Sequence, residues 1–151
     1  MSKRVLVVAL AVAATLVVPV RGAAAAPAGD YCVVHVTGQR ASGELTVSAP
    51  RCYAAYDTAL RAEAVTFQIG LHCDGYDLAA PCTSVVGTGC TGGWLNVSAA
   101  WNNRISSTLS GCPTILHFDG FNLTGAVAAV SGPGPHNLTG FNNRTSSIQY
   151  T

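Results

Sequence analysis

Apolar and polar residues divide the chain into a long apolar leader followed by short alternating segments. In the alternating part, β-branched residues lie between clusters of Gly, Pro, Asn and Asp, a pattern typical of strands joined by tight turns. Residues 31–37 and 44–48 predict a hairpin, and residues 52–64, which contain neither Gly nor Pro, predict a short helix. Further strands are expected at residues 65–72, 114–118, 126–130 and 147–150.

The leader has the layout of a secretory signal peptide. Basic residues near the start precede an apolar run at residues 5–20, and small residues follow at 22–28. A membrane anchor is the alternative, but the run is short for a span and contains Pro19. We therefore expect residues 1–28 to be removed and the mature chain to be secreted, with no membrane association after cleavage.

Removal of the leader changes the net charge of the chain. Three of the eight basic residues lie in it and all seven acidic residues follow it, so the mature chain has five basic residues against seven acidic, a net charge of −2. The remaining arginines are scattered, and no basic patch is formed. The sequence therefore gives no support for a nucleic-acid partner or an anionic membrane partner.

The six cysteines all follow the leader, and an even number in an exported chain predicts three disulfides. A zinc site is the alternative, but no CxxC pair and no Cys/His cluster has ligand spacing. Sequence alone leaves the pairing open. We favour Cys32–Cys52, Cys73–Cys82 and Cys90–Cys112.

A seven-residue pattern occurs twice, at residues 101–107 and 141–147. Each copy has an aromatic residue, two Asn, one Arg, a variable residue and two Ser. The residues upstream also match, because residues 71–80 align with residues 116–125. The chain therefore contains two copies of one structural unit. The first copy carries a few additional residues, which we place within residues 82–93.

These segments resemble the βγ-crystallin family. Residues 118–125, FDGFNLTG, resemble its hairpin signature, and the two Asn-Asn-Arg-x-Ser-Ser segments resemble its calcium motif. The resemblance covers about residues 65–151. It implies an all-β Greek-key sandwich of two four-strand motifs, at about residues 65–111 and 112–151. Residues 29–64 match nothing in the pattern, and we expect them to form an added N-terminal hairpin segment tied by a disulfide.

The first hairpin departs from the family pattern. Cys73 replaces an aromatic residue and Ala80 replaces Gly, which normally permits a backbone conformation that a Cβ disfavours. Leu78 and Leu123 replace the second aromatic residue. We expect the first hairpin to be distorted unless a Cys73–Cys82 bridge compensates.

The resemblance implies two Ca²⁺ sites, each combining one Asn-Asn-x-x-Ser loop with the hairpin turn of the other motif. Carbonyl, amide, hydroxyl and carboxylate oxygens suit Ca²⁺, but one carboxylate per site predicts weak binding, with a Kd of roughly 10⁻⁴–10⁻³ M. The alternative is that Asn and Ser only stabilise turns through local hydrogen bonds. The expected ligands are Asn102, Asn103 and Ser106 with Asp119, and Asn142, Asn143 and Ser146 with Asp74.

Catalysis is not predicted, and we expect the protein not to be an enzyme. His72 and His117 occupy matched positions, and alternation from the leucines before them predicts that both face solvent. The sequence contains no His-Glu-x-x-His, Gly-x-Ser-x-Gly or phosphate-loop motif.

Two further roles stay open beside calcium binding. The resemblance extends to small exported bacterial crystallin-fold proteins, which include a metalloproteinase inhibitor and a killer toxin-like protein. An inhibitor of a secreted protease needs a rigid exposed loop, and residues 81–90 are the candidate. The other role is that of a toxin or cell-surface interaction module, which no specific residue indicates. We expect a monomer. The centre of the candidate inhibitory loop is Thr83, Ser84, Val85 and Val86.

Overall fold

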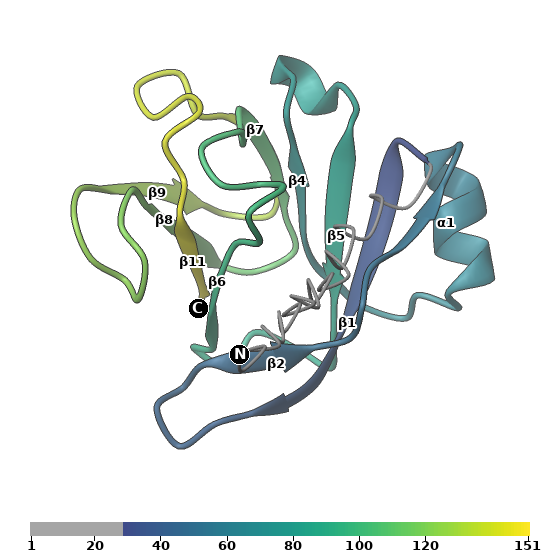
Figure 1. Cartoon of the computed structure of the whole chain (residues 1–151), viewed down its shortest axis with the longest axis horizontal. Coiled ribbons are helices and arrows are strands. Elements are labelled where there is room, and N and C mark those ends of the chain that lie inside the picture. Colours follow the sequence, from purple (N-terminus) through teal and green to yellow (C-terminus); the bar gives the residue numbers. More distant parts are fainter. Residues whose placement is uncertain (1–28) are drawn as a thin grey trace, which may run out of the picture.

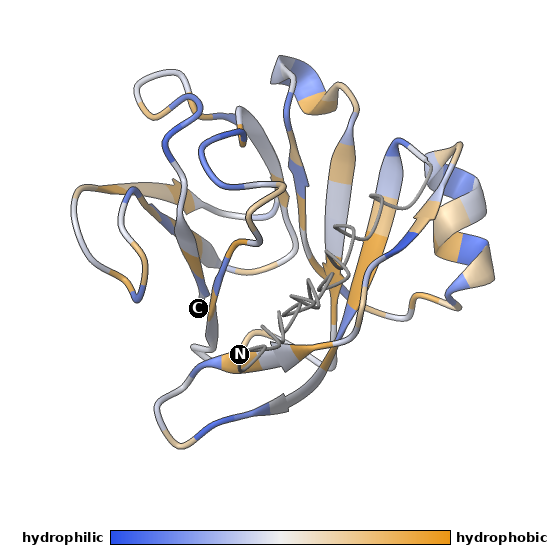
Figure 2. Ribbon diagram, viewed as in Figure 1, coloured by the Kyte–Doolittle hydropathy of each residue, from blue (hydrophilic) through white to orange (hydrophobic). Residues whose placement is uncertain are grey.

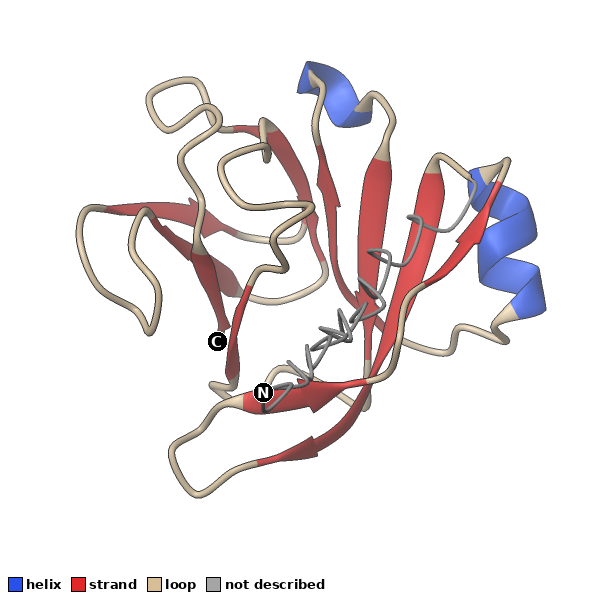
Figure 3. Cartoon of the chain, in the orientation of Figure 1, coloured by secondary structure: helices blue, strands red, loops and turns tan. Residues whose placement is uncertain are grey.

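A computed structural model describes residues 29–151, and the predicted signal peptide lies outside the described residues. Strands make up most of the regular secondary structure, and the two helical segments are short (Figure 3). The elements are β1 (Tyr31–Gln39), β2 (Leu45–Val47), β3 (Arg51–Tyr53), α1 (Tyr56–Ala62), β4 (Gln68–Cys73), the 3₁₀ turn η1 (Tyr76–Leu78), β5 (Cys82–Val86), β6 (Trp94–Asn96), β7 (Ser107–Ser110), β8 (Thr114–Phe118), β9 (Val127–Ser131), β10 (Gly134–Asn137) and β11 (Ser147–Tyr150).

The strands form two sheets (Figure 1). The first has seven strands in the order β10-β7-β4-β5-β1-β2, with β3 also paired to β1. The second has four strands in the order β6-β11-β8-β9. The predicted all-β class is therefore confirmed.

The strand order shows two interlocked Greek-key motifs, β4–β7 and β8–β11. Each motif gives its third strand to the sheet of the other: β6 pairs with β11, and β10 pairs with β7. The remaining three strands of each motif stay together in one sheet. This exchange gives the two motifs an approximate twofold relation and confirms the predicted sandwich of two four-strand motifs.

The N-terminal segment extends the first sheet. Strand β1 runs parallel to β5 and antiparallel to β2, so the predicted hairpin is confirmed. The tip of that hairpin reaches the second sheet, where the Trp94 amide donates to the Gly43 carbonyl at 3.1 Å and the indole N–H donates to the Ser42 carbonyl at 3.1 Å. The predicted short helix is confirmed as α1, which lies beside β1 and β3 at the outer end of this sheet (Figure 1).

The main core lies between the two sheets and draws on both motifs. Figure 2 shows apolar residues along the strands of both sheets. Two smaller apolar clusters lie where the N-terminal segment covers the first sheet, one of them around Leu71 and the Cys73–Cys82 pair. The first sheet is therefore covered on parts of both faces. The most buried apolar residues of the main core are Ile69, Ile105, Cys112, Ile115, Ile148 and Tyr150.

All three expected disulfides are present, and no cysteine of residues 29–151 is free, which removes the zinc alternative. Cys32–Cys52 joins directly paired positions of β1 and β3, and Cys73–Cys82 joins directly paired positions of β4 and β5. Cys90–Cys112 connects the loop after β5 to the turn before β8. Such cross-links are characteristic of oxidising compartments. Within residues 29–151, no helix is both long enough and apolar enough to cross a membrane.

The expected inhibitory loop was wrong. Thr83 to Val86 form strand β5, which lies inside the first sheet between β4 and β1. Ser84, Val85 and Val86 are only 2%, 3% and 5% exposed. The adjacent β-branched residues favour a strand, and β1 covers the edge that a protease would have to approach.

Candidate calcium-binding loops

The two Asn-Asn-Arg-x-Ser-Ser loops lie side by side and contact each other through matched hydrogen bonds. Asn103 and Asn143 adopt left-handed conformations, with φ of 57° and 54°, which Asn tolerates better than most residues. The Asn103 amide donates to the Thr145 carbonyl, and the Asn143 amide donates to the Ile105 carbonyl, both at 3.0 Å. Each loop is therefore positioned by the other, as the twofold relation requires.

Side chains pair across the loops as well. The Ser106 hydroxyl donates to Asn143 Oδ1 at 3.1 Å, and the Ser146 hydroxyl donates to Asn103 Oδ1 at 3.4 Å. The structure thus brings the second Asn of one loop to the first Ser of the other. The expected grouping, with both in the same loop, differs because the third strands are exchanged between the sheets.

Each hairpin aspartate is paired with the arginine of its own motif. Arg104 Nη2 lies 2.6 Å from Asp74 Oδ2, and Arg144 Nη2 lies 2.7 Å from Asp119 Oδ2. Hydrogen bonds from Arg144 and from the Ala126 amide lower the pKa of Asp119, despite an opposing effect of desolvation. Asp74 and Asp119 each lie beside the loop of their own motif. The expected sites instead combined each aspartate with the loop of the other motif.

The last Ser of each pattern fastens a hairpin, a role that sequence reasoning missed. The Ser107 hydroxyl donates to the Gly75 carbonyl at 2.6 Å and accepts the Leu78 amide at 3.0 Å. Ser147 makes the same two contacts, at the same distances, with Gly120 and Leu123 of the second hairpin. The signal was available in the repeat, because the final Ser occurs in both copies.

The first Asn of each loop presents an unusual feature. Asn102 Oδ1 and Asn142 Oδ1 are buried, and neither has a hydrogen-bond donor within the described part of the chain. A buried acceptor without a donor typically costs about 1–3 kcal/mol, so such atoms are rare unless water or an ion supplies the missing partner. The two atoms occupy matched positions and lie in the loops that carry the calcium pattern.

The donor set fits a hard cation in kind. Amide, hydroxyl, backbone carbonyl and one carboxylate oxygen from each hairpin are the ligand types that Ca²⁺ accepts. Residues 29–151 contain no group of three or more His, Cys, Asp or Glu side chains that could hold a metal ion. Amide and hydroxyl oxygens would therefore have to dominate any site formed by these loops.

The expected solvent exposure of the two histidines was wrong: His72 is 1% exposed and His117 is fully buried. In the second motif, Ile115 and His117 point into the core, while Leu116 lies on the outer face. In the first motif, Leu71 points away from the main core and packs against the N-terminal segment. An apolar residue therefore lies on the outer face of this strand too. The alternation predicts the wrong face because an apolar Leu lies on the outer face of each strand.

Hydroxyl groups satisfy both buried imidazoles. Thr108 Oγ1 lies 3.1 Å from His72 Nδ1 and 3.1 Å from His117 Nε2. The other ring nitrogens contact Tyr150 Oη at 2.9 Å and Thr145 Oγ1 at 3.2 Å. Each neutral imidazole has one donor and one acceptor, which suits this chain of hydroxyl partners. This chain of hydrogen bonds crosses the interface between the two motifs and holds them in register.

Burial keeps both imidazoles neutral. Desolvation lowers the pKa of His117 to about 3 and moves the pKa of His72 well below its ordinary value, where repulsion by His117 adds to the effect. Burial also raises the pKa of the Tyr150 hydroxyl. These groups contact one another rather than an open cleft, so we assign them a structural role.

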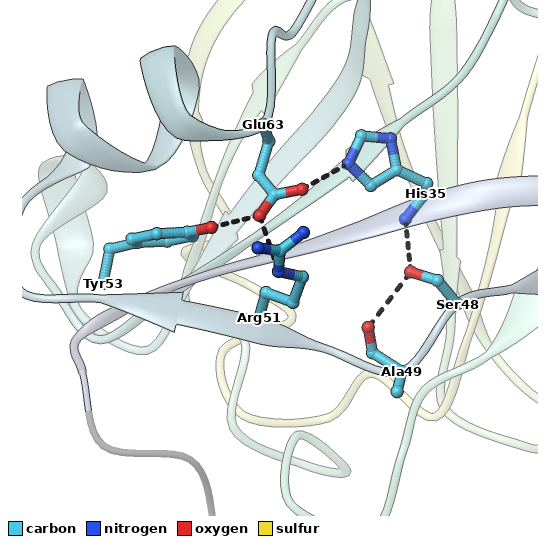
Figure 4. Close-up of polar contacts among 6 residues, drawn as sticks. All are labelled: His35, Ser48, Ala49, Arg51, Tyr53 and Glu63. Carbon is cyan, nitrogen blue, oxygen red and sulfur yellow. Dashed lines mark hydrogen bonds and ion pairs between the residues drawn. The ribbon is translucent and has the colours of Figure 1, made fainter.

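A second polar cluster ties α1 to the N-terminal strands (Figure 4). Glu63, whose side chain is 5% exposed, places Oε2 3.0 Å from His35 Nε2 and Oε1 3.1 Å from Arg51 Nε, and it accepts the Tyr53 hydroxyl. The hydrogen bond from Tyr53 is the main cause that lowers the pKa of Glu63, and the same bond raises the pKa of Tyr53. Because both carboxylate oxygens have partners, this cluster fixes the end of α1 against β1 and β3.

Two solved structures are similar to this chain. One is a βγ-crystallin from an archaeon, with 13% identity and a TM-score of 0.45, covering 57% of this chain and 100% of its own. The other is a double mutant of a βγ-crystallin domain from Clostridium beijerinckii, with 17% identity and a TM-score of 0.46, covering 56% of this chain and 98% of its own. The Greek-key sandwich with exchanged third strands is given by the strand pairing of this chain itself.

No protein-family model matches the chain. No curated protein matches it either.

Proposed function

We propose that this is a secreted, disulfide-stabilised, βγ-crystallin-like protein that binds Ca²⁺ weakly at its two paired loops. One observation carries the proposal: Asn102 Oδ1 and Asn142 Oδ1 are buried at matched positions without donors. A bound cation would give both oxygens a partner and would recover the cost of their desolvation. The candidate ligands are the loop Asn and Ser oxygens, with one hairpin aspartate for each site.

Calcium would act on the stability of the fold. Both loops contribute to each pairing of Asn with Ser, so a cation bound there would hold the two motifs together. A ligand that binds only the folded state stabilises it by RT ln(1 + [L]/Kd). With a Kd of about 1 mM and about 10 mM Ca²⁺, the gain is about 1.4 kcal/mol per site.

Thermal unfolding of the oxidised mature chain, in EDTA and then in about 10 mM CaCl₂, tests this proposal. We expect Ca²⁺ to raise the midpoint by several degrees. The double variant Asn102→Ala/Asn142→Ala should lose this rise while keeping its stability in EDTA, because the change removes two unpaired buried oxygens. The matched control is Ser107→Ala/Ser147→Ala, which should lower the midpoint equally in both solutions, because these hydroxyls hold the hairpins. The proposal fails if millimolar Ca²⁺ produces neither calorimetric heat nor a shift.

A further inference from the structure

The hairpin carboxylate proposed for each site is already paired with a positive charge. The guanidinium of Arg104 lies 2.6 Å from the Asp74 carboxylate and 5.7 Å from the centre of the Trp101 ring. The guanidinium of Arg144 is held in the same way, 2.7 Å from Asp119 and 4.9 Å from the ring of Phe141. Both arginines therefore occupy one place in the repeat, between an aromatic ring and the hairpin carboxylate.

That carboxylate is the strongest oxygen ligand that each site can offer. The other candidate ligands are neutral amides, hydroxyls and backbone carbonyls, so Asp74 and Asp119 carry the only formal negative charges of the two ligand sets. A cation that used either carboxylate would compete with the arginine bound to it and would also be repelled by the guanidinium. Calcium affinity depends on ligand charge, so this competition lowers it.

We propose that Arg104 and Arg144 regulate the two sites as internal competitors, so that Ca²⁺ binds fully only when the guanidinium leaves the hairpin carboxylate. This inference rests on the proposed calcium function. It makes the arginine of each Asn-Asn-Arg-x-Ser-Ser loop the residue that sets the affinity, whereas the Asn and Ser residues supply the ligands.

The same contacts make the two sites unequal. Asp119 uses both carboxylate oxygens, because Oδ1 also accepts the Ala126 amide at 2.7 Å. The residue that matches Ala126 in the first hairpin is Pro81, which has no N–H to donate. Arg104 also donates to the Ala100 carbonyl at 3.1 Å and so keeps a partner when Asp74 is withdrawn. The site that uses Asp74 therefore binds Ca²⁺ at lower concentration.

Calorimetric titration with CaCl₂ of Arg104→Met and Arg144→Met tests the competition, because Met removes the charge and keeps much of the side-chain length. The matched control is Arg40→Met, which breaks an exposed ion pair of the same kind, Arg40 to Glu44 at 2.6 Å, in the N-terminal hairpin. We expect Arg104→Met to bind Ca²⁺ about fivefold more tightly than Arg40→Met, near the upper end for loss of an exposed ion pair. Arg144→Met should gain affinity as well, and Arg104→Lys should retain the low affinity.

Trp101 gives a second readout, because the matching residue in the other loop is Phe141 and does not contribute. In a Trp94→Phe background, Ca²⁺ should shift the Trp101 emission when Arg104 leaves its position near the ring. The additional change Arg104→Met should abolish that shift.

The outcomes separate this inference from the function on which it rests. If the wild-type chain binds Ca²⁺ and all the methionine variants bind it equally, the competition is disproved and calcium binding stands. If neither the wild type nor any variant binds at millimolar Ca²⁺, both ideas fail. Binding by Arg104→Met but not by the wild type would support the competition and reject calcium binding by the native chain.

Discussion

The first and second Greek-key motifs share their loops but differ in their hairpins and edges. In both motifs the last Ser fastens the hairpin, the Arg pairs with the hairpin aspartate, and the second Asn contacts the other loop. Because these contacts match, the two loops constrain the hairpins of both motifs in the same way. The differences lie where one motif received additional structure.

The two hairpins reach similar turns by different means. In the second hairpin, Gly125 has φ of +83°, and a Cβ there would lie 2.1 Å from Asp119 Oδ1. In the first hairpin, Ala80 takes the place of that Gly, and the Cys73–Cys82 disulfide joins the two strands at its base. A covalent link has therefore accompanied the loss of a glycine, as the departures from the family pattern led us to expect.

The edges differ because the N-terminal segment was added to one motif. Strand β5 of the first motif is flanked by β4 and β1, whereas β9 of the second motif pairs with β8 and ends its sheet. The same addition covers the outer face around Leu71, which has no counterpart at Leu116. The comparison indicates that the first motif depends on the extension and the second depends on its own turns.

The largest expected effect concerns the matched histidines. The folded-state pKa of His117 is about 3, against an ordinary value of 6.5, so the unfolded chain binds a proton between these values that the folded chain does not. The stabilisation is complete above about pH 6.5 and is lost as the pH falls towards 3. Burial of His117 alone should lower the free energy of unfolding by about 2 kcal/mol between pH 6.5 and pH 5. Burial of His72 should lower it further over the same range.

Urea unfolding at several pH values from 7 to 5 measures this loss before most carboxylates titrate. The control variant is His136→Gln, which changes a partly exposed histidine outside the buried pair. A free energy of unfolding that stays constant over this range would contradict neutral burial of both imidazoles.

The next largest effect separates the two hairpins. Replacing Cys73 and Cys82 together with Ala should lower the free energy of unfolding by about 3 kcal/mol, because a short loop is no longer closed in the unfolded chain. The corresponding change in the second motif, Gly125→Ala, should cost more than about 1 kcal/mol through backbone strain and the contact with Asp119. Urea unfolding of both variants gives the comparison. Equal stability of the Cys variant and the wild type would show that the extension already secures the first hairpin.

The smallest effect sharpens the same comparison. Ser107→Ala and Ser147→Ala each remove two partly buried hydrogen bonds from a hairpin, at a cost of about 1–2 kcal/mol. We expect Ser147→Ala to cost more, because only the first hairpin retains a disulfide. Thermal unfolding in EDTA measures the difference, and a larger loss for Ser107→Ala would reverse our view of which hairpin depends on its serine.

Local patterns predicted much of the fold. Turn residues and β-branched alternation located the first hairpin and β8, and a stretch without Gly or Pro located the short helix. The favoured pairing of the six cysteines, which the sequence alone left open, was also correct. Several short strands escaped prediction: β3, β6, β7 and β10 have only three or four residues and carry little alternation. Their pairing is decided by distant partners, because β6 needs β11 and β10 needs β7.

The repeat itself was determined by the sequence, since two copies of one pattern specify two similar units whatever their arrangement. Only the tertiary structure decided which copy contacts which, because the exchange of third strands depends on pairing between residues far apart in the chain. That exchange brings Ser106 to Asn143 and Ser146 to Asn103. Burial was decided at the same level: His72 and His117 lie inside because the opposite motif supplies one hydroxyl partner to each, Tyr150 to His72 and Thr108 to His117, which no local alternation can reveal.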